Sequence, residues 1–320
     1  MTDLVGKIIS GNRRAIAKAI TLIESSRPDH QEEAQQLLSS LLPHTGKTIR
    51  LGMTGIPGVG KSTFIESFGK MLTALGIKVA VLAVDPSSTI SGGSILGDKT
   101  RMEELARDEL AFIRPTPSKG TLGGIARYTR EAMLILEAAG FEVIIIETVG
   151  VGQSEVAVAD LVDMFLLLLS PGGGDELQGI KRGIMELADL IIINKADGDF
   201  KNAAKLAAAD CKNALHLMRA KSPDWVVEVL ETSALHKIGL EEVWAKIIEF
   251  KNIMKDNGEF ESRRSYQDIS GIWVELTELL TDQLKKDNKE VVAEIENAVH
   301  DKKITPHKAA HDLLGYIKNS

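Results

Sequence analysis

The middle of the chain alternates between short, mainly apolar runs and longer amphipathic stretches. Apolar runs without a regular polar face are typical of strands that are covered by helices on both sides of a parallel sheet. The runs occupy 49–53, 79–84, 143–146, 165–169, 190–193 and 226–230. The stretches between them carry apolar residues at helical spacing and include 62–75, 123–139, 177–188, 201–220 and 240–254. This alternation predicts an α/β domain with a doubly wound, mostly parallel sheet over about 47–255.

Helical patterns flank this domain on both sides. Residues 1–46 carry apolar positions at helical spacing, so we expect an N-terminal helical extension. Beyond the domain the strand pattern stops, and 272–284 and 291–299 are predicted helices of a C-terminal helical region, 256–320. The apolar stripe of this region needs a partner surface, which is either the N-terminal helices or a second subunit.

Composition narrows the class of protein. Hydrophobic residues make up 44% and charged residues 26% of the 320, as in a globular protein with a full core. The formal net charge of -7 argues against broad binding to nucleic acid or to an anionic membrane. The single cysteine, Cys211, excludes an internal disulfide and a cysteine-rich metal site. Without a recognisable secretory signal or a membrane-spanning run, we expect a cytoplasmic protein.

A phosphate-binding loop is predicted directly after the first apolar run. The segment Gly55-Ile56-Pro57-Gly58-Val59-Gly60-Lys61-Ser62-Thr63 matches G-x-x-x-x-G-K-[ST] between a predicted strand and a predicted helix. Glycines let the backbone curl, so that amides and the helix N-terminus face the phosphates of a nucleotide. Lys61 is expected to neutralise phosphate oxygens, and the Ser62 hydroxyl to bind Mg²⁺. The alternative is an ordinary glycine turn, which the strand and helix on either side make less favourable.

Magnesium needs further oxygen ligands, which we expect at the ends of neighbouring strands. Asp85 follows the run 79–84, Glu147 follows the run 143–146, and Asp98 lies in the loop between them. Each of these acids has an alternative role as a helix cap or a solvated loop carboxylate.

Gly150 is placed so that its backbone amide can sense a γ-phosphate. In Ras-like proteins a water-orienting glutamine directly follows such a glycine, whereas Val151 stands there in this chain. Gln153 is the nearest glutamine and lies two positions further on. We therefore expect the protein alone to hydrolyse its nucleotide slowly.

A guanine-binding loop is predicted after the run 190–193. There Asn194-Lys195-Ala196-Asp197 matches N-K-x-D. Asp197 can accept two hydrogen bonds from the ring N–H and the exocyclic amine of guanine, which adenine does not present on that edge. Lys195 can cover the base, and Asn194 can tie this loop to the phosphate loop. Ser233-Ala234-Leu235 follows the next predicted strand and can offer a backbone amide to the guanine carbonyl.

Four further motifs resemble those of the MeaB/ArgK family of GTPases. They are DPSS at 85–88, GDKTRM at 97–102, ETVGVGQSE at 147–155 and GGGDELQGIK at 172–181. The resemblance covers most of the chain. It implies a GTPase chaperone of an adenosylcobalamin-dependent methylmalonyl-CoA mutase, which gates cofactor loading and protects the mutase. It also implies a homodimer that is built largely with the C-terminal helices.

By the same resemblance, 172–181 is an additional switch that senses the mutase. Lys181 and Arg182 are then candidates for stabilising the charge of phosphoryl transfer. The alternative is a plain glycine-rich connection. His307 and His311 are four residues apart on a predicted helix, but we interpret them as surface residues because no third metal ligand lies nearby.

Two other functions compete with that of a GTP-hydrolysing chaperone. One is a protein kinase of the ArgK type, which would pass the γ-phosphate of GTP or ATP to a protein. The other is a nucleotide-gated scaffold that does not hydrolyse GTP. For the kinase, no catalytic base is apparent besides the acids of the nucleotide site.

Overall fold

The computed structural model of the chain describes residues 2–85, 102–117, 122–148, 154–171 and 182–318. The chain divides into two compact units, Met1–Gln267 and Asp268–Ser320. Among the described residues, no helix has the length and apolar character needed to cross a membrane.

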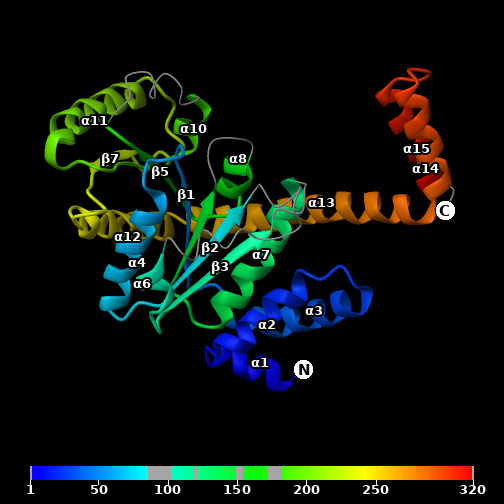
Figure 1. Cartoon of the computed structure of the whole chain (residues 1–320), viewed down its shortest axis with the longest axis horizontal. Helices are drawn as coiled ribbons and strands as arrows, with labels where there is room; N and C mark the ends of the chain where they lie inside the picture. The colour runs from blue at the N-terminus through cyan, green and yellow to red at the C-terminus, as the bar shows by residue number, and fades with distance from the viewer. Residues whose placement is uncertain (1, 86–101, 118–121, 149–153, 172–181, 319–320) are drawn as a thin grey trace. The chain divides into compact units, whose positions relative to one another are not determined.

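The first unit is built on a seven-stranded sheet in which every pair of neighbours is parallel (Figure 1). The strands are β1 (Ile49–Thr54), β2 (Val79–Asp85), β3 (Ala111–Pro117), β4 (Val143–Thr148), β5 (Met164–Leu169), β6 (Leu190–Ile193) and β7 (Glu228–Glu231), in the spatial order β3-β2-β4-β1-β5-β6-β7. The four strands β1, β4, β5 and β6 are buried along their whole length. The predicted doubly wound α/β fold is therefore confirmed.

Helices cover both faces of the sheet. One face is covered by α4 (Lys61–Ala74), α6 (Glu103–Ala106) and α12 (Leu240–Asp256), and the other by α7 (Leu122–Ala138), α8 (Ser154–Ala159), α10 (Arg182–Leu187) and α11 (Lys201–His216). Short 3-10 turns occupy η1 (Leu42–His44) and η3 (Gly198–Phe200). Alternate residues of β2 separate to the two faces, since Val79 and Val81 pack with α4 while Ala80 and Leu82 pack with α7.

Two strand predictions need correction. The sequence pattern missed β3, because Arg114 and Pro115 interrupt the apolar residues that begin it. Strand β3 stands at the end of the sheet, where proline is tolerated because one side of the strand has no neighbour in the ladder. The last strand begins at Glu228 and not at 226, and Val226 is 78% exposed.

The N-terminal extension consists of α1 (Thr2–Ile9), α2 (Arg13–Ile23) and α3 (Pro28–Leu41). Asn12 caps α2, because its side-chain oxygen accepts hydrogen bonds from the amides of Arg14 and Ala15, both at 3.1 Å. These helices lie beside α7 (Figure 1). They share one apolar core with α7, α8 and the sheet face that these two helices cover. The extension is thus packed onto the α/β domain.

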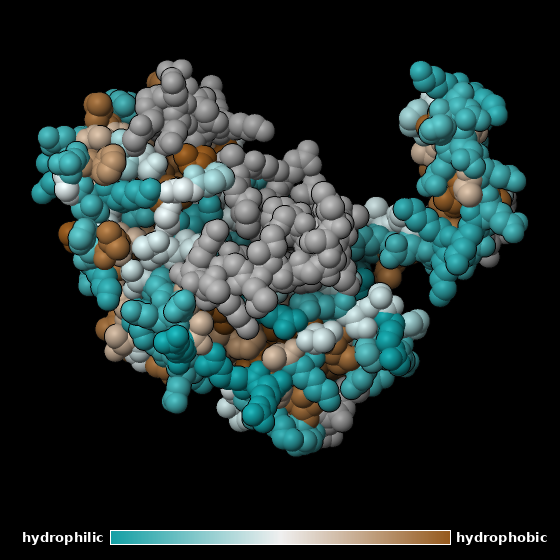
Figure 2. All heavy atoms as spheres, viewed as in Figure 1, coloured by the Kyte–Doolittle hydropathy of each residue, from teal (hydrophilic) through white to brown (hydrophobic). Residues whose placement is uncertain are grey.

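The C-terminal helices are α13 (Glu259–Asp287), α14 (Lys289–His300) and α15 (Pro306–Lys318). Helix α13 is much longer than the predicted 272–284. It begins directly after Gly258, whose φ of 77° ends α12, and the Asn257 side chain accepts a hydrogen bond from the Glu259 amide at 2.9 Å. Figure 2 shows apolar residues within the otherwise hydrophilic surface of the C-terminal helices.

Candidate functional site

The phosphate loop lies between β1 and α4, and its glycines are required by close approaches. A side-chain carbon added at Gly55 would lie 2.5 Å from the carbonyl oxygen of Leu168 in β5. At Gly60, where φ is 93°, an added carbon would lie 2.8 Å from the Asn194 side-chain nitrogen. Gly58 has a φ of 86°, a conformation that favours glycine. The described loop 55–60 therefore has the curled backbone that the sequence predicted.

Lys61 and Ser62 begin α4 at the rim of this loop. The Lys61 ammonium donates hydrogen bonds to the carbonyl oxygens of Gly55 at 2.6 Å and Ile56 at 3.3 Å, so it lies over the loop. Lys61 is 9% exposed, so water and salt screen its positive charge only weakly. From this position the Lys61 ammonium can donate to phosphate oxygens in place of the two carbonyl oxygens.

Two of the predicted magnesium ligands lie together. The Ser62 hydroxyl donates to the Glu147 carboxylate at 3.4 Å, and Glu147 is 5% exposed. A hydroxyl and a carboxylate are the hard oxygen ligands that Mg²⁺ prefers, so these two residues fit the ion. Within the described ranges, no group of three or more histidine, cysteine, aspartate or glutamate side chains is arranged to hold a metal. Asp85 is the last residue of β2, and β2 is the neighbour of β4, the strand that carries Glu147.

Several predicted site residues lie outside the described residues. They are Asp98, Gly150, Gln153 and Lys181. Their assigned roles stay predictions.

Two buried threonines, which the sequence analysis did not single out, connect the strand ends beside the phosphate loop. The Thr148 hydroxyl, at the end of β4, donates to the Thr54 hydroxyl at the end of β1 over 2.9 Å. Both residues are fully buried. Polar residues at the last position of two apolar strands are the signal that could have identified them.

Asn194 joins the base loop to the phosphate loop. Its side-chain N–H donates to the Val59 carbonyl at 3.0 Å, and its side-chain oxygen accepts from the Ala234 amide at 3.0 Å and from the Thr232 hydroxyl at 3.4 Å. Lys195, at a φ of 61°, donates to the Gly58 carbonyl at 2.7 Å. The two loops that the sequence predicted to share a nucleotide are thus adjacent, although they are far apart along the chain.

Asp197 lies on the same side of the sheet and is held by the loop after β7. The Ser233 hydroxyl donates to the Asp197 carboxylate, and it accepts a hydrogen bond from the His236 amide at 3.2 Å. The His236 ring lies 3.9 Å from the other carboxylate oxygen. These contacts fix the position of the carboxylate beside the loop after β7. The sequence analysis did not predict His236 as a site residue. Its position three residues after Ser233, in the same loop, is the feature that could have indicated it.

The backbone amides of 233–235 are not equivalent. The Ser233 amide donates to the Ile238 carbonyl at 3.0 Å, and the Ala234 amide donates to Asn194. Among the described residues, the Leu235 amide has no hydrogen bond recorded within the protein, and the Leu235 residue is 73% exposed. Of the three predicted residues, Ser233 and Ala234 thus already use their amides within the protein, and a contact of any of the three with guanine stays a prediction.

A parallel sheet that carries a phosphate loop on one strand end, and an Asn-Lys-x-Asp loop on another, defines the class of P-loop GTPases. Comparison with known proteins agrees. The family model described as Methylmalonyl Co-A mutase-associated GTPase MeaB matches residues 16–289, and the chain belongs to this family. It is a GTPase, and the predicted resemblance to the MeaB/ArgK family is confirmed.

Relatives cover nearly the whole chain. A "Putative GTPase" of Caulobacter vibrioides is 54% identical, over 98% of this chain and 96% of its own length. "GTPase ArgK" of Escherichia coli is 52% identical over 84% of this chain and 81% of its own. "Methylmalonic aciduria type A homolog, mitochondrial" of Mus musculus is 47% identical over 98% of this chain and 78% of its own.

Solved structures agree with the fold. The crystal structure of an "LAO/AO transport system kinase" is 40% identical and covers 99% of this chain and 97% of its own, with a TM-score of 0.78. HypB from Helicobacter pylori, at 18% identity and a TM-score of 0.50 over 69% of this chain and 94% of its own, shares the fold alone.

Proposed function

We propose that this GTPase is a chaperone of an adenosylcobalamin-dependent methylmalonyl-CoA mutase, whose GTP cycle gates cofactor loading and protects the mutase. One observation carries the proposal, namely the match of residues 16–289 to a family described as associated with that mutase. The mouse relative, named for methylmalonic aciduria, supports it.

The proposed nucleotide site uses the two adjacent loops. Gly55 to Thr63 enclose the phosphates, and Asp197 accepts the hydrogen bonds of guanine while Lys195 covers the base. Lys61 exchanges its contacts with the Gly55 and Ile56 carbonyls for phosphate oxygens, and so brings a positive charge to where negative charge develops.

We assign Mg²⁺ to Ser62 and Glu147, whose side-chain oxygens already lie 3.4 Å apart, with Asp85 and Asp98 as further ligands. When bound, Mg²⁺ neutralises the phosphate charge that develops during hydrolysis. Glu147 is the residue of this chain through which the end of β4 meets the phosphate loop, so it also couples the loop to the proposed switch that includes Gly150 and Gln153.

Slow hydrolysis by the protein alone remains part of the proposal, because Val151 stands where Ras-like proteins carry a water-orienting glutamine. Lys181 is proposed to complete the site when the mutase binds the segment 172–181. Neutralising Lys181 and Arg182 should then lower mutase-stimulated hydrolysis and leave the basal rate unchanged. An unchanged stimulated rate would remove this role.

A homodimer is proposed through α13. Its apolar side chains recur at spacings of three and four residues and are largely exposed: Ile269, Ile272, Trp273, Leu276, Leu279 and Leu280. The stripe can pack against the same stripe of a second copy, because a two-fold axis brings identical surfaces of two subunits together.

The decisive experiment combines the purified chain with a methylmalonyl-CoA mutase and GTP that is labelled at the γ-phosphate. The chaperone proposal expects the label in free phosphate, faster release when mutase is present, and adenosylcobalamin transfer that depends on the nucleotide. Label on a protein side chain would favour the kinase activity for which the 40% identical relative is named. Intact GTP after long incubation with the mutase would favour a scaffold that does not hydrolyse it.

A further inference from the structure

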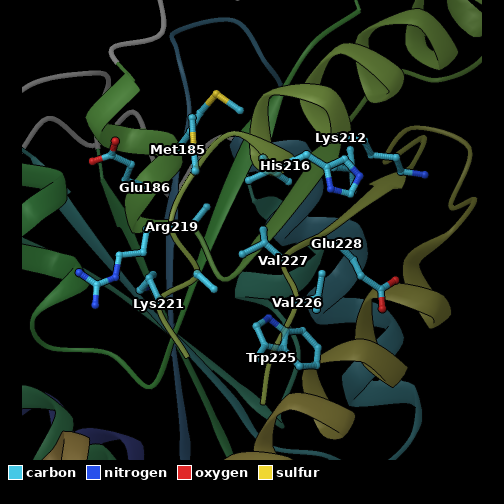
Figure 3. A pocket seen from close by; sticks show the side chains of 15 residues that line it. Met185, Glu186, Lys212, His216, Arg219, Lys221, Trp225, Val226, Val227 and Glu228 are labelled. Atoms are coloured by element: carbon cyan, nitrogen blue, oxygen red, sulfur yellow. The ribbon is translucent and has the colours of Figure 1, made fainter. Parts of the chain in front are cut away.

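A cavity lies away from the nucleotide loops. Its volume is about 350 Å³, and it is enclosed by the end of α10, the last turns of α11, the connection 217–227 and the start of β7 (Figure 3). Ala188, in its wall, comes just before β6 begins, whereas the guanine-binding loop follows the other end of the same strand. None of the predicted nucleotide-site residues lines this cavity.

The interior of the cavity is apolar. Its wall is formed by Met185, Leu215, Met218, Trp225, Val227 and Val229. The polar atom of the indole is already satisfied, because the Trp225 ring N–H donates to the Asp189 carbonyl at 2.7 Å. A cavity at the lower end of the ~300–1,000 Å³ that small-molecule sites occupy, with an apolar wall, accepts a compact apolar group.

The rim of the cavity carries more positive than negative charge. Lys221 is held by Asp189 at 2.8 Å, and Glu228 is neutralised by Lys246 at 2.7 Å. Lys212 and Arg219 are exposed, and within the described ranges neither has an ion pair with an acid. Both extend outward from opposite sides of the rim in Figure 3.

The remaining rim groups do not reverse this balance. Glu186 contributes an acid from α10, and the exposed His216 ring stands at the α11 side. Long basic side chains at the edge of an apolar cavity can fold over the charged end of a ligand while their stems stay on apolar surface.

From this apolar interior and cationic rim, we propose that the cavity binds a small organic anion with an apolar body, such as an aliphatic or aromatic carboxylate. The apolar body lies against Trp225 and Val227, and the carboxylate lies at the rim within reach of Arg219 or Lys212. This site is separate from the GTP site and does not depend on the proposed chaperone function.

The test titrates the full chain, saturated with GDP, with octanoate, phenylacetate and the fluorescent anion anilinonaphthalene sulfonate, by calorimetry and by competition. We expect saturable binding of at least one carboxylate, at one molecule per chain, that displaces the fluorescent probe. Octanol, which shares the apolar body of octanoate but lacks its charge, should bind more weakly.

Two variants separate the interior from the rim. Val227→Trp fills the cavity and should weaken binding of octanoate and octanol at least about tenfold, since the apolar group is then excluded. Arg219→Glu leaves the interior unchanged and should weaken octanoate about fivefold without affecting octanol, because it reverses an exposed charge. Leu206→Trp and Lys205→Glu, both on the exposed part of α11 outside the cavity, are the matched controls.

GDP affinity and the far-ultraviolet spectrum report whether each variant is folded. The proposal is overturned if no member of the panel binds saturably. It is also overturned if the two cavity variants bind as the controls do, which would assign the binding to another apolar surface such as α13.

Discussion

Asn194 is the residue on which the geometry of the nucleotide site depends most. It is 2% exposed and bonds with three partners: the Val59 carbonyl in the phosphate loop, and the Ala234 amide and Thr232 hydroxyl beyond β7. Removing a buried hydrogen-bonding group costs ~1–3 kcal/mol for each partner left unsatisfied. The Asn194 side chain, together with Lys195 at the Gly58 carbonyl, therefore holds the base loop against the phosphate loop.

The selectivity for guanine is predicted to belong to Asp197. In Asp197→Asn the new amide can no longer accept both guanine donors but can donate to the second carbonyl of xanthine, so GTP should bind about 100-fold more weakly and XTP more tightly. Competition binding with GTP, XTP and ATP measures this change. Asp199→Asn, two residues away and exposed, is the control. If Asp197→Asn retained full preference for GTP, another residue would select the base.

Asp108 is predicted to make the free energy of unfolding depend on pH in the acidic range. Burial alone would raise its pKa, but hydrogen bonds from Lys70, Thr73 and the Leu110 amide outweigh burial and hold the pKa at about 2, below the ordinary 3.8. A carboxyl whose pKa is lowered by folding stabilises the protein above its ordinary pKa, and this contribution disappears as pH falls through the folded value.

Asp108→Asn should therefore remove part of the loss of stability between about pH 4 and pH 2. Denaturant unfolding of both proteins across this pH range checks the prediction. Asp3→Asn, at an exposed ion pair with Lys7, is the control substitution. Parallel stability curves for Asp108→Asn and the parent protein would contradict the argument.

At the scale of elements, the phosphate loop is defined by its neighbours as much as by its own residues. Gly55 packs against the backbone of β5, because the sheet places β1 directly beside β5. The sequence predicted the glycine motif of the phosphate loop. It did not predict the strand that Gly55 packs against, since Leu168 is over a hundred residues away and no local pattern encodes that contact.

Gly55→Ala should weaken GTP and GDP together at least about tenfold, because the added carbon would lie 2.5 Å from the Leu168 carbonyl and the backbone must move. Nucleotide titration measures the loss. Gly6→Ala in α1, where an added carbon meets no atom within 4 Å, should bind nucleotide normally. Equal nucleotide affinity in both variants would show that the loop does not need its observed backbone.

The strands that the sequence predicted well were those buried on both faces, because such strands consist mainly of apolar residues, with the buried Arg50 of β1 as an exception. The strand β3 was missed and the start of β7 was misplaced, and these two stand at the ends of the sheet. A strand at a sheet end has a neighbour on one side only, so Arg114 and Pro115 are tolerated there and the sequence pattern becomes weaker.

At the scale of the whole molecule, an ion pair and several hydrogen bonds hold the first turns of α13 against the segments that enter β1 and β5. Arg264 donates to Asp163 over 2.6 and 2.7 Å and to the Thr48 carbonyl over 2.7 Å, and Gln267 donates to the Val162 carbonyl at 2.8 Å. Asp163 also accepts from the Arg50 amide in β1 at 2.7 Å. The first turns of the long helix thus belong to the α/β unit, which explains why the boundary between the two compact units falls at Gln267.

The proposed dimer yields a prediction at this scale. Trp273→Asp places a charge in the apolar stripe of α13, where Trp273 is 66% exposed in a single chain, and should convert a dimer to a monomer. Analytical ultracentrifugation measures the change. GTP affinity should stay the same, because the nucleotide loops lie in the other compact unit.

Thr281→Asp, exposed on the same helix but outside the apolar stripe, is the control and should remain a dimer. A monomeric parent protein, or a Trp273→Asp variant that still forms a dimer, would assign the stripe to a different partner.

The sequence by itself determined the phosphate loop and the guanine-binding loop, because each depends on residue types at short spacing within one strand-to-helix connection. It also determined the fold class, from the alternation of apolar runs and amphipathic stretches over about 47–255, and the family, from four motifs between 85 and 181. The sequence predicted that Asn194 ties the two loops and that Ser62 and Glu147 share an ion, but only the tertiary structure decided the contacts themselves: Ser62 with Glu147, Asn194 with the Val59 carbonyl, and Ser233 with Asp197. The order of the strands brings these pairs together. That order follows from packing between segments far apart in the chain, for which local periodicity carries no information.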